Sequence, residues 1–443
     1  MKLVVIGGVA AGMSAASKLK RAHSNAEIAV YERGNYLSYG ACGLPYFISG
    51  ENDDYNKMLM RSKEQFEQAG IKVQIAHEVV KVDPKKKQVM VKCLTTGSLF
   101  LDGYDKLIIS TGASPIVPPF EGVGLKQIHV LKTIEDGIKI KEICERHDVQ
   151  NIVVVGAGYI GVEVVEAMVH RGKHVRLVEL APRILTSFDP EITDITENHL
   201  REKGVHLNLS EKVVKFVGDE AVTGVVTDQG RYPADLVILS IGVKPNTSFL
   251  KDTGINLADN GAIVIDREMK TNVADIYAAG DCAEVYHQVT EENSFLPLGT
   301  NANKCGRILG ENLAGGKKKY IGTLGSAGIK VCDMELGRSG LSEPEAIKAG
   351  FEVTTVFVET MDTPPYYPGS QPIWIKLICE KQTKRILGAQ TLGFKGAVLR
   401  VDIFAVAIHN KMTAPELGMT DLVYAPPFAG VWDAVHIASN AVK

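Results

Sequence analysis

The chain has 443 residues, more than a single hydrophobic core usually organises, so two or three domains are expected. Hydrophobic residues make up 45% and charged residues 23%, a composition that excludes a disordered or fibrous protein. The 49 basic residues do not outnumber the 52 acidic ones, which argues against a nucleic acid partner, and no run of about 20 apolar residues predicts a membrane span.

The N-terminal residues predict a strand, a glycine-rich turn and a helix. Lys2–Ile6 is typical of a buried parallel strand, and a helical pattern begins soon after it. Three glycines lie in the turn: Gly7, Gly8 and Gly12. Bare backbone there would let a dinucleotide pyrophosphate reach the N–H groups of the helix N-terminus. A second strand, Glu27–Tyr31, leads to Glu32, at the spacing from Gly12 where a carboxylate bonds ribose hydroxyls.

Residues 152–179 repeat this unit, which predicts a second dinucleotide site. Its glycines fit the full GxGxxG pattern: Gly156, Gly158 and Gly161. The first turn departs from that pattern, because Val9 occupies the middle glycine position. Glu179 ends the next strand and should favour NADH, since a carboxylate repels the 2′-phosphate of NADPH. Arg183 nearby leaves NADPH possible.

Two further segments complete a resemblance to a known family. Leu107–Gly112 ends in Thr111 and Gly112, and Thr271–Asp281 ends in Tyr-Ala-Ala-Gly-Asp. With the two glycine-rich units, these segments resemble the pyridine nucleotide-disulfide oxidoreductases over essentially the whole chain. The resemblance implies that FAD binds the first unit and that Asp281 holds its ribityl chain. It places further residues at the cofactors: Arg33, Thr111 and Gly112.

The resemblance also implies the architecture. We expect an α/β protein with two Rossmann-like domains, one for FAD and one for NAD(P)H, and a C-terminal α+β domain that forms a homodimer. The expected FAD domain covers residues 1–115 and 248–320, and the NAD(P)H domain is inserted at 116–247. The expected dimerisation domain covers residues 321–443.

Cys42 lies in the segment Ser38–Pro45, which resembles the coenzyme A-disulfide reductase branch of this family. Relatives of the glutathione-reductase kind carry a second cysteine five residues later, where this chain has Phe47. Cys42 is therefore expected to form a mixed disulfide with an external thiol, coenzyme A, or a sulfenic acid. A helix starting at Gly43 and the flavin should stabilise its thiolate.

Two tyrosines of the C-terminal region are candidate proton donors. By resemblance, Tyr366 and Tyr424 reach the partner subunit's Cys42, which would make the dimer obligate; Tyr367 replaces Tyr366 if the register slips by one. The alternative is that both tyrosines only pack at the dimer interface. Further positions match substrate contacts of the branch, or offer charge for phosphates: Ser14, Lys18, Arg21, Ser38, Arg61 and Asn303. Trp432 departs from the branch, which has a basic residue there.

The resemblance thus predicts NAD(P)H-dependent reduction of coenzyme A disulfide, persulfide or polysulfide. Peroxidases and water-forming oxidases of the family carry a histidine where this chain has Ala10 and Ala11. An NADH oxidase that reduces O2 stays an alternative, as does a flavin redox-sensing or electron-transfer partner protein. Seven cysteines without a CxxC pair favour a reducing cytoplasm, and neither they nor the histidines predict a metal site.

Overall fold

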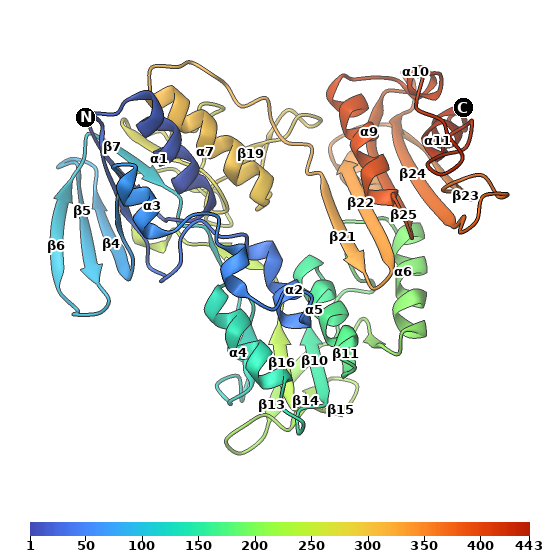
Figure 1. Ribbon diagram of the computed structural model, residues 1–443, viewed down its shortest axis with the longest axis horizontal. Coiled ribbons are helices and arrows are strands. Elements are labelled where there is room, and N and C mark those ends of the chain that lie inside the picture. The colour runs from blue at the N-terminus through green and yellow to red at the C-terminus, as the bar shows by residue number, and fades with distance from the viewer.

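A computed structural model describes residues 1–443 as three lobes (Figure 1). The first lobe is built on a parallel sheet of order β18-β7-β1-β2-β3. Its strands are β1 (Lys2–Ile6), β2 (Glu27–Tyr31), β3 (Lys72–Gln74), β7 (Lys106–Ile109) and β18 (Ile276–Ala278). An antiparallel meander flanks it: β4 (His77–Asp83), β5 (Gln88–Cys93) and β6 (Leu99–Gly103). Its helices are α1 (Ala10–Ala22), α3 (Lys63–Gln68) and α7 (Gly299–Leu313), whereas α2 (Leu44–Ser49) packs against the second lobe.

The second lobe repeats this design with a parallel sheet of order β12-β11-β10-β16-β9. The strands are β9 (Ile128–Val130), β10 (Asn151–Val155), β11 (His174–Val178), β12 (His206–Asn208) and β16 (Leu236–Leu239). Its meander consists of β13 (Val213–Val217), β14 (Gly224–Thr227) and β15 (Arg231–Pro233). Its helices are α4 (Ile134–Cys144), α5 (Tyr159–His170) and α6 (Pro190–Glu202). The chain crosses between the two lobes through the antiparallel pair β8 (Ala113–Pro115) and β17 (Val243–Pro245). Later in the chain, β19 (Val285–Tyr286) pairs with β20 (Asn293–Ser294).

The third lobe is an antiparallel sheet of order β21-β22-β25-β24-β23 with helices packed on it. Its strands are β21 (Ala327–Val331), β22 (Met334–Gly340), β23 (Val353–Met361), β24 (Pro372–Glu380) and β25 (Ile386–Gly393). Its helices are α8 (Glu343–Lys348), α9 (Ala397–His409), α10 (Ala414–Gly418) and α11 (Ala434–Asn440). Helix α6 of the second lobe lies beside this sheet, as Figure 1 shows.

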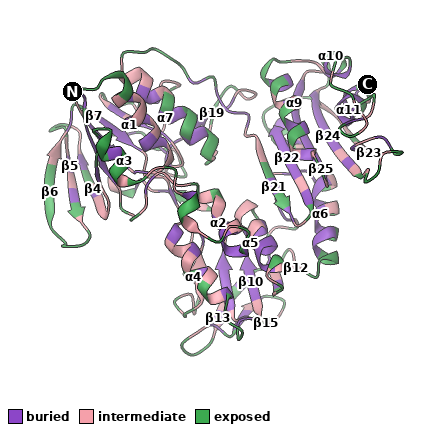
Figure 2. Cartoon of the chain, viewed as in Figure 1, coloured by how far each residue is buried: buried purple, intermediate pink, exposed green.

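The central strands are buried on both faces (Figure 2), which explains their continuous apolar sequences. Helices α1 and α7 pack with their backbones close together. A Cβ atom at Gly306 would lie 2.3 Å from the carbonyl oxygen of Ala11, and one at Gly310 would lie 2.4 Å from that of Ala15. This approach brings Asn303 of α7 to Ser14 of α1.

The predicted fold class is confirmed: two parallel-sheet dinucleotide lobes precede a C-terminal α+β lobe. None of the helices is long and apolar enough to cross a membrane.

Candidate active site

The two glycine-rich turns share the same steric constraints at their first and last glycines. Gly7 and Gly156 have φ angles of +102° and +99°, in a backbone region that residues other than glycine rarely adopt. Cβ atoms there would lie 2.1 Å and 2.3 Å from the backbone oxygens of Ser110 and Ser240. Gly12 and Gly161 are equally constrained, because a Cβ atom at each would lie within 2.1 Å of a turn carbonyl. The glycine patterns read from the sequence therefore have steric causes.

The helices that follow these turns begin without a side-chain cap. No side chain bonds the first-turn N–H groups of α1 or α5, whereas five other helices begin with a capping box. Backbone donors at the positive end of a helix suit the pyrophosphate of a dinucleotide. Both turns therefore fit the groups that the sequence predicts, FAD at α1 and NAD(H) at α5.

Glu32 and Glu179 occupy equivalent places beside the two turns. Glu32 accepts the N–H of Gly8 at 2.7 Å, and Glu179 accepts that of Ala157 at 2.6 Å. Each carboxylate also accepts the backbone N–H of the residue two positions later in the chain, Gly34 and Ala181 respectively. These bonds fix the carboxylates at the ends of β2 and β11. The guanidinium of Arg183 could in principle contact the 2′-phosphate of NADPH, but it is paired with Asp194 of α6.

The remaining predicted FAD residues follow neighbouring strands. Thr111 and Gly112 follow β7, and the Thr111 hydroxyl donates to the carbonyl oxygen of Asn246 at 2.7 Å. Asp281 follows β18, which pairs with β7, and lies 3.3 Å from the ammonium group of Lys132. Arg33 is largely exposed and lies 3.8 Å from Glu78. The carboxyl ends of these parallel strands meet at one sheet edge, beside the first glycine-rich turn.

Cys42 lies in a single 3₁₀ turn, Ala41–Gly43, directly before α2. Of the seven free cysteines it alone is exposed. The protein around its sulfur nevertheless excludes enough solvent to raise the pKa of the thiol, and the charges of Glu163 and Asp281 raise it further, while Lys132 opposes them. The expectation that the flavin and the local helix together stabilise the thiolate stays a prediction, since the protein contacts alone raise this pKa.

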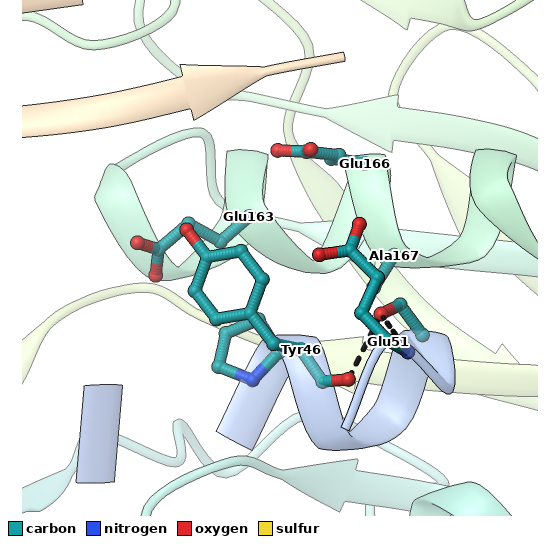
Figure 3. Close-up of a pocket in the computed structure, with 7 residues that line it drawn as sticks. Tyr46, Glu51, Glu163, Glu166 and Ala167 are labelled. Atoms are coloured by element: carbon teal, nitrogen blue, oxygen red, sulfur yellow. Dashed lines mark hydrogen bonds between the residues drawn. The ribbon is translucent and has the colours of Figure 1, made fainter. Parts of the chain in front are cut away.

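A shallow pocket of about 10 Å³, room for about one water molecule, lies between α2 and α5. Figure 3 shows Tyr46 of α2 facing Glu163 and Glu166 of α5 across it. Burial, helped by the charge of Glu166, raises the pKa of Glu163 to about 7. Glu166 is paired with Lys330 at 2.9 Å. Glu163 thus changes charge near neutral pH beside the cysteine.

The substitution Glu163→Gln should make Cys42 easier to ionise. The cysteine titrates above its ordinary pKa, where Glu163 is ionised, so removing this negative charge lowers the pKa of the thiol. Alkylation of Cys42 by iodoacetamide, followed by mass spectrometry across pH, should shift to lower pH. Glu166→Gln is the matched control, because Lys330 already balances that carboxylate, and its profile should move less. Unchanged profiles for Glu163→Gln would show that Glu163 does not contribute to this pKa.

The predicted substrate positions form two groups in the structure. On α1 and α7, the Ser14 hydroxyl donates to Asn303 at 2.9 Å, while Lys18 lies 3.3 Å from Glu311 and Arg21 is exposed. Ser38, with a φ angle of +47°, accepts the N–H of Met60 through its carbonyl oxygen. This bond places Arg61, the next residue after Met60, near Ser38. The Arg61 guanidinium stacks on the ring of Phe66, 4.4 Å from its centre. The basic groups on α1 are thus partly engaged by protein partners.

The tyrosines come together on the C-terminal lobe. The hydroxyl oxygens of Tyr366 and Tyr424 are 3.4 Å apart, and the residues are 72% and 46% exposed. Tyr367 is less exposed, and its N–H donates to the carbonyl oxygen of Pro364. Exposed apolar residues follow Tyr424 along the chain: Phe428, Val431 and Trp432. Such a patch is typical of a protein interface.

Three residues at the site were not predicted from the sequence: Tyr159, Glu163 and Lys132. Tyr159 and Glu163 follow the second GxG pattern on α5, so the signal was present but was used only for its glycines. Lys132 carries no motif, and only the tertiary structure brings it to Asp281.

Comparisons with known proteins agree on one family. Residues 1–294 match the family model described as pyridine nucleotide-disulphide oxidoreductase, and residues 326–435 match the model of its dimerisation domain. The NAD(P)H coenzyme A polysulfide/persulfide reductase of Pyrococcus horikoshii is 39% identical, over 100% of this chain and 98% of that protein. The crystal structure of reduced CoADR-RHD from Bacillus anthracis has a TM-score of 0.96 at 35% identity, over 100% of this chain and 80% of that one. The water-forming NADH oxidase of Lactobacillus brevis, bound to NADH, has a TM-score of 0.96 at 33% identity, over 100% and 98%.

Proposed function

We infer the function of this chain from its family. The chain belongs to the pyridine nucleotide-disulphide oxidoreductases. It is accordingly an oxidoreductase that uses FAD and NAD(P)H, as members of this family do. We infer that it reduces coenzyme A disulfide, or the related persulfide or polysulfide, through Cys42. The observation that carries this proposal is the single exposed cysteine beside the dinucleotide sites, with buried Phe47 in place of a second one.

The proposed chemistry needs one thiolate and one proton donor. FAD, when bound, takes a hydride from the nicotinamide and supplies an electron pair to sulfur. The Cys42 thiolate attacks the disulfide, forms a Cys42–S–S–coenzyme A bond and releases one coenzyme A thiolate. Two electrons then cleave this bond, which restores the Cys42 thiolate, and Tyr424 or Tyr366 of the partner subunit protonates the departing thiolate. The exposed tyrosine pair supports this role.

Positions for coenzyme A follow from the two groups of residues described above. We propose that Ser14, Asn303 and Ser38 contact coenzyme A and that the charged side chains of Lys18, Arg21 and Arg61 attract its phosphates. Lys18 would exchange Glu311 for a phosphate, which its partial exposure permits.

Assembly, domains and location complete the proposal. The dimerisation-domain match supports a homodimer, and we propose that it is obligate because the tyrosines would act across subunits. We propose domain boundaries at 1–115 with 248–320, 116–247 and 321–443, supported by the separate sheets. Free cysteines throughout the chain support a cytoplasmic location.

An NADH oxidase is the second candidate, because oxidases share the fold at similar identity. Ala10 and Ala11 in the first turn argue against it, since neither offers an acid or base for O2 chemistry. Oxidation of NADH with coenzyme A disulfide under nitrogen, compared with NADH in air without disulfide, separates the two. We expect fast turnover only with the disulfide. Turnover in air alone would assign the oxidase, and no NADH oxidation in either assay would favour the redox-partner class.

NADH should be the better electron donor. Glu179 is fixed beside the second turn, and Arg183 is engaged by Asp194, so a 2′-phosphate would meet uncompensated negative charge. The penalty should be on the order of 1 to 3 kcal/mol, or about 5- to 150-fold in kcat/KM. Steady-state kinetics with both donors test this. Equal or higher kcat/KM with NADPH would contradict it.

A further inference from the structure

The segment Ile184–Asp189 touches the second glycine-rich turn on one side. The N–H of Leu185 donates to the carbonyl oxygen of Ala157 at 2.8 Å, inside the turn. The Ser187 hydroxyl donates to the hydroxyl of Tyr159, the first residue of α5, at 3.3 Å. The rings of Phe188 and Tyr159 lie 6.1 Å apart. The segment therefore holds the backbone of the turn and the side chain that follows it.

The same segment is bound to the C-terminal lobe on its other side. Gln390 of β25 accepts the N–H of Asp189 at 2.8 Å and donates to its carboxylate at 2.9 Å. Arg338 of β22 donates to the carbonyl oxygen of Ser187. Gln390 is 1% exposed and Arg338 is 7% exposed, so water does not compete for these bonds.

A buried lysine completes this junction. Lys376 of β24 is 1% exposed, and its ammonium group donates to Glu191 at 2.8 Å and to Glu343 at 2.7 Å, with Asp189 at 3.4 Å. Burial alone would lower the pKa of Lys376, but these hydrogen bonds outweigh it and raise the pKa. Removing one partner of a buried ion pair leaves an uncompensated buried charge, so these contacts are costly to break.

We propose that the segment Ile184–Asp189 sets the position of the second dinucleotide turn from the C-terminal lobe, which makes Gln390, Arg338 and Lys376 positioning residues for the nicotinamide nucleotide. This inference rests on the proposed function only in assigning that nucleotide to the second turn. Strand β24 also follows the loop that carries Tyr366. The loop of Tyr366 and the contacts to the nucleotide turn therefore meet on the same sheet.

Affinity of the FAD-loaded dimer for NAD+, measured by isothermal titration calorimetry, tests the proposal. Gln390→Met keeps the side-chain size and removes both bonds to Asp189, so the Kd should rise roughly 3- to 30-fold. Ser187→Ala removes only the bond to Tyr159 and should raise the Kd roughly 2- to 10-fold. Asp333→Asn is the matched control, because it weakens the contacts of His199 in α6, and of Lys203 just after it, with the same lobe but leaves the segment untouched.

A second measurement separates positioning from general damage. After reduction by dithionite, oxidation of the variants by coenzyme A disulfide should proceed at the wild-type rate, because the segment lies on the nucleotide side. Should Gln390→Met fail to fold, Ser187→Ala decides alone, since it removes one hydroxyl from a partly exposed residue.

Unchanged Kd values in folded Gln390→Met and Ser187→Ala would overturn the inference while the proposed function stands. An equal rise in Asp333→Asn would also overturn it, because docking of the lobes in general would then explain the effect. Wild-type protein that binds no NAD+ would overturn both this inference and the nicotinamide part of the proposed function.

Discussion

Replacing Cys42 by serine is expected to abolish reduction of coenzyme A disulfide. Cys42 is the one exposed thiol of the chain, and Phe47 leaves no second cysteine to complete an internal disulfide. A serine hydroxyl cannot form the mixed disulfide that the electrons must cleave, so turnover should fall to the background rate. FAD should remain bound, because its predicted contacts lie on the first turn and after β7 and β18, and NADH should still bleach the flavin absorbance.

Cys93→Ser is the matched control for this variant. Cys93 lies on β5, in the meander that flanks the first sheet, and its replacement should leave turnover unchanged. Anaerobic NADH oxidation with coenzyme A disulfide measures both variants. Residual turnover in Cys42→Ser above a few per cent of the wild-type rate would show that another group transfers the electrons.

Replacing Tyr424 by phenylalanine should slow the disulfide half-reaction by roughly 10²-fold or more, because a general acid typically contributes that much. The ring and its packing are retained and only the hydroxyl is lost. Tyr366 lies 3.4 Å away, so Tyr366→Phe should show whether the two hydroxyls act together or one suffices. The measurement is the stopped-flow oxidation of the reduced protein by coenzyme A disulfide.

Tyr367→Phe serves as the control for both tyrosines, since Tyr367 is not paired with Tyr424, and it should leave the rate unchanged. An unchanged rate in Tyr424→Phe together with a slow Tyr366→Phe would transfer the acid role to Tyr366. Unchanged rates in both would return the tyrosines to interface packing.

Backbone constraints made much of this molecule predictable. Gly7, Gly12, Gly156 and Gly161 are required by contacts closer than a side chain allows, and such requirements recur as a local pattern. The carboxylate after the second strand of each unit is also predictable, because the intervening helix and strand set its distance from the turn. The presence of two parallel-sheet lobes could therefore be predicted from sequence, as the confirmed fold class shows.

Contacts between distant segments could not be predicted in this way. Glu163 acquires its raised pKa because α5 packs against α2, and Lys376 is buried because three carboxylates from two lobes converge on it. A sequence shows these residues only as ordinary charged side chains of a helix and a strand. The groups that raise the pKa of Cys42 were hidden for the same reason, since Glu163 and Asp281 are brought near it only by the fold.

Cys42 alone is expected to pass the electrons from the flavin to the substrate, through a mixed disulfide with coenzyme A. The most direct test is the mass of the Cys42 peptide from protein isolated without reductant and then treated with coenzyme A disulfide. We expect a peptide that carries one coenzyme A, which is removed when NADH is added. A Cys42 that stays free, or becomes a sulfenic acid while coenzyme A disulfide is not consumed, would contradict it.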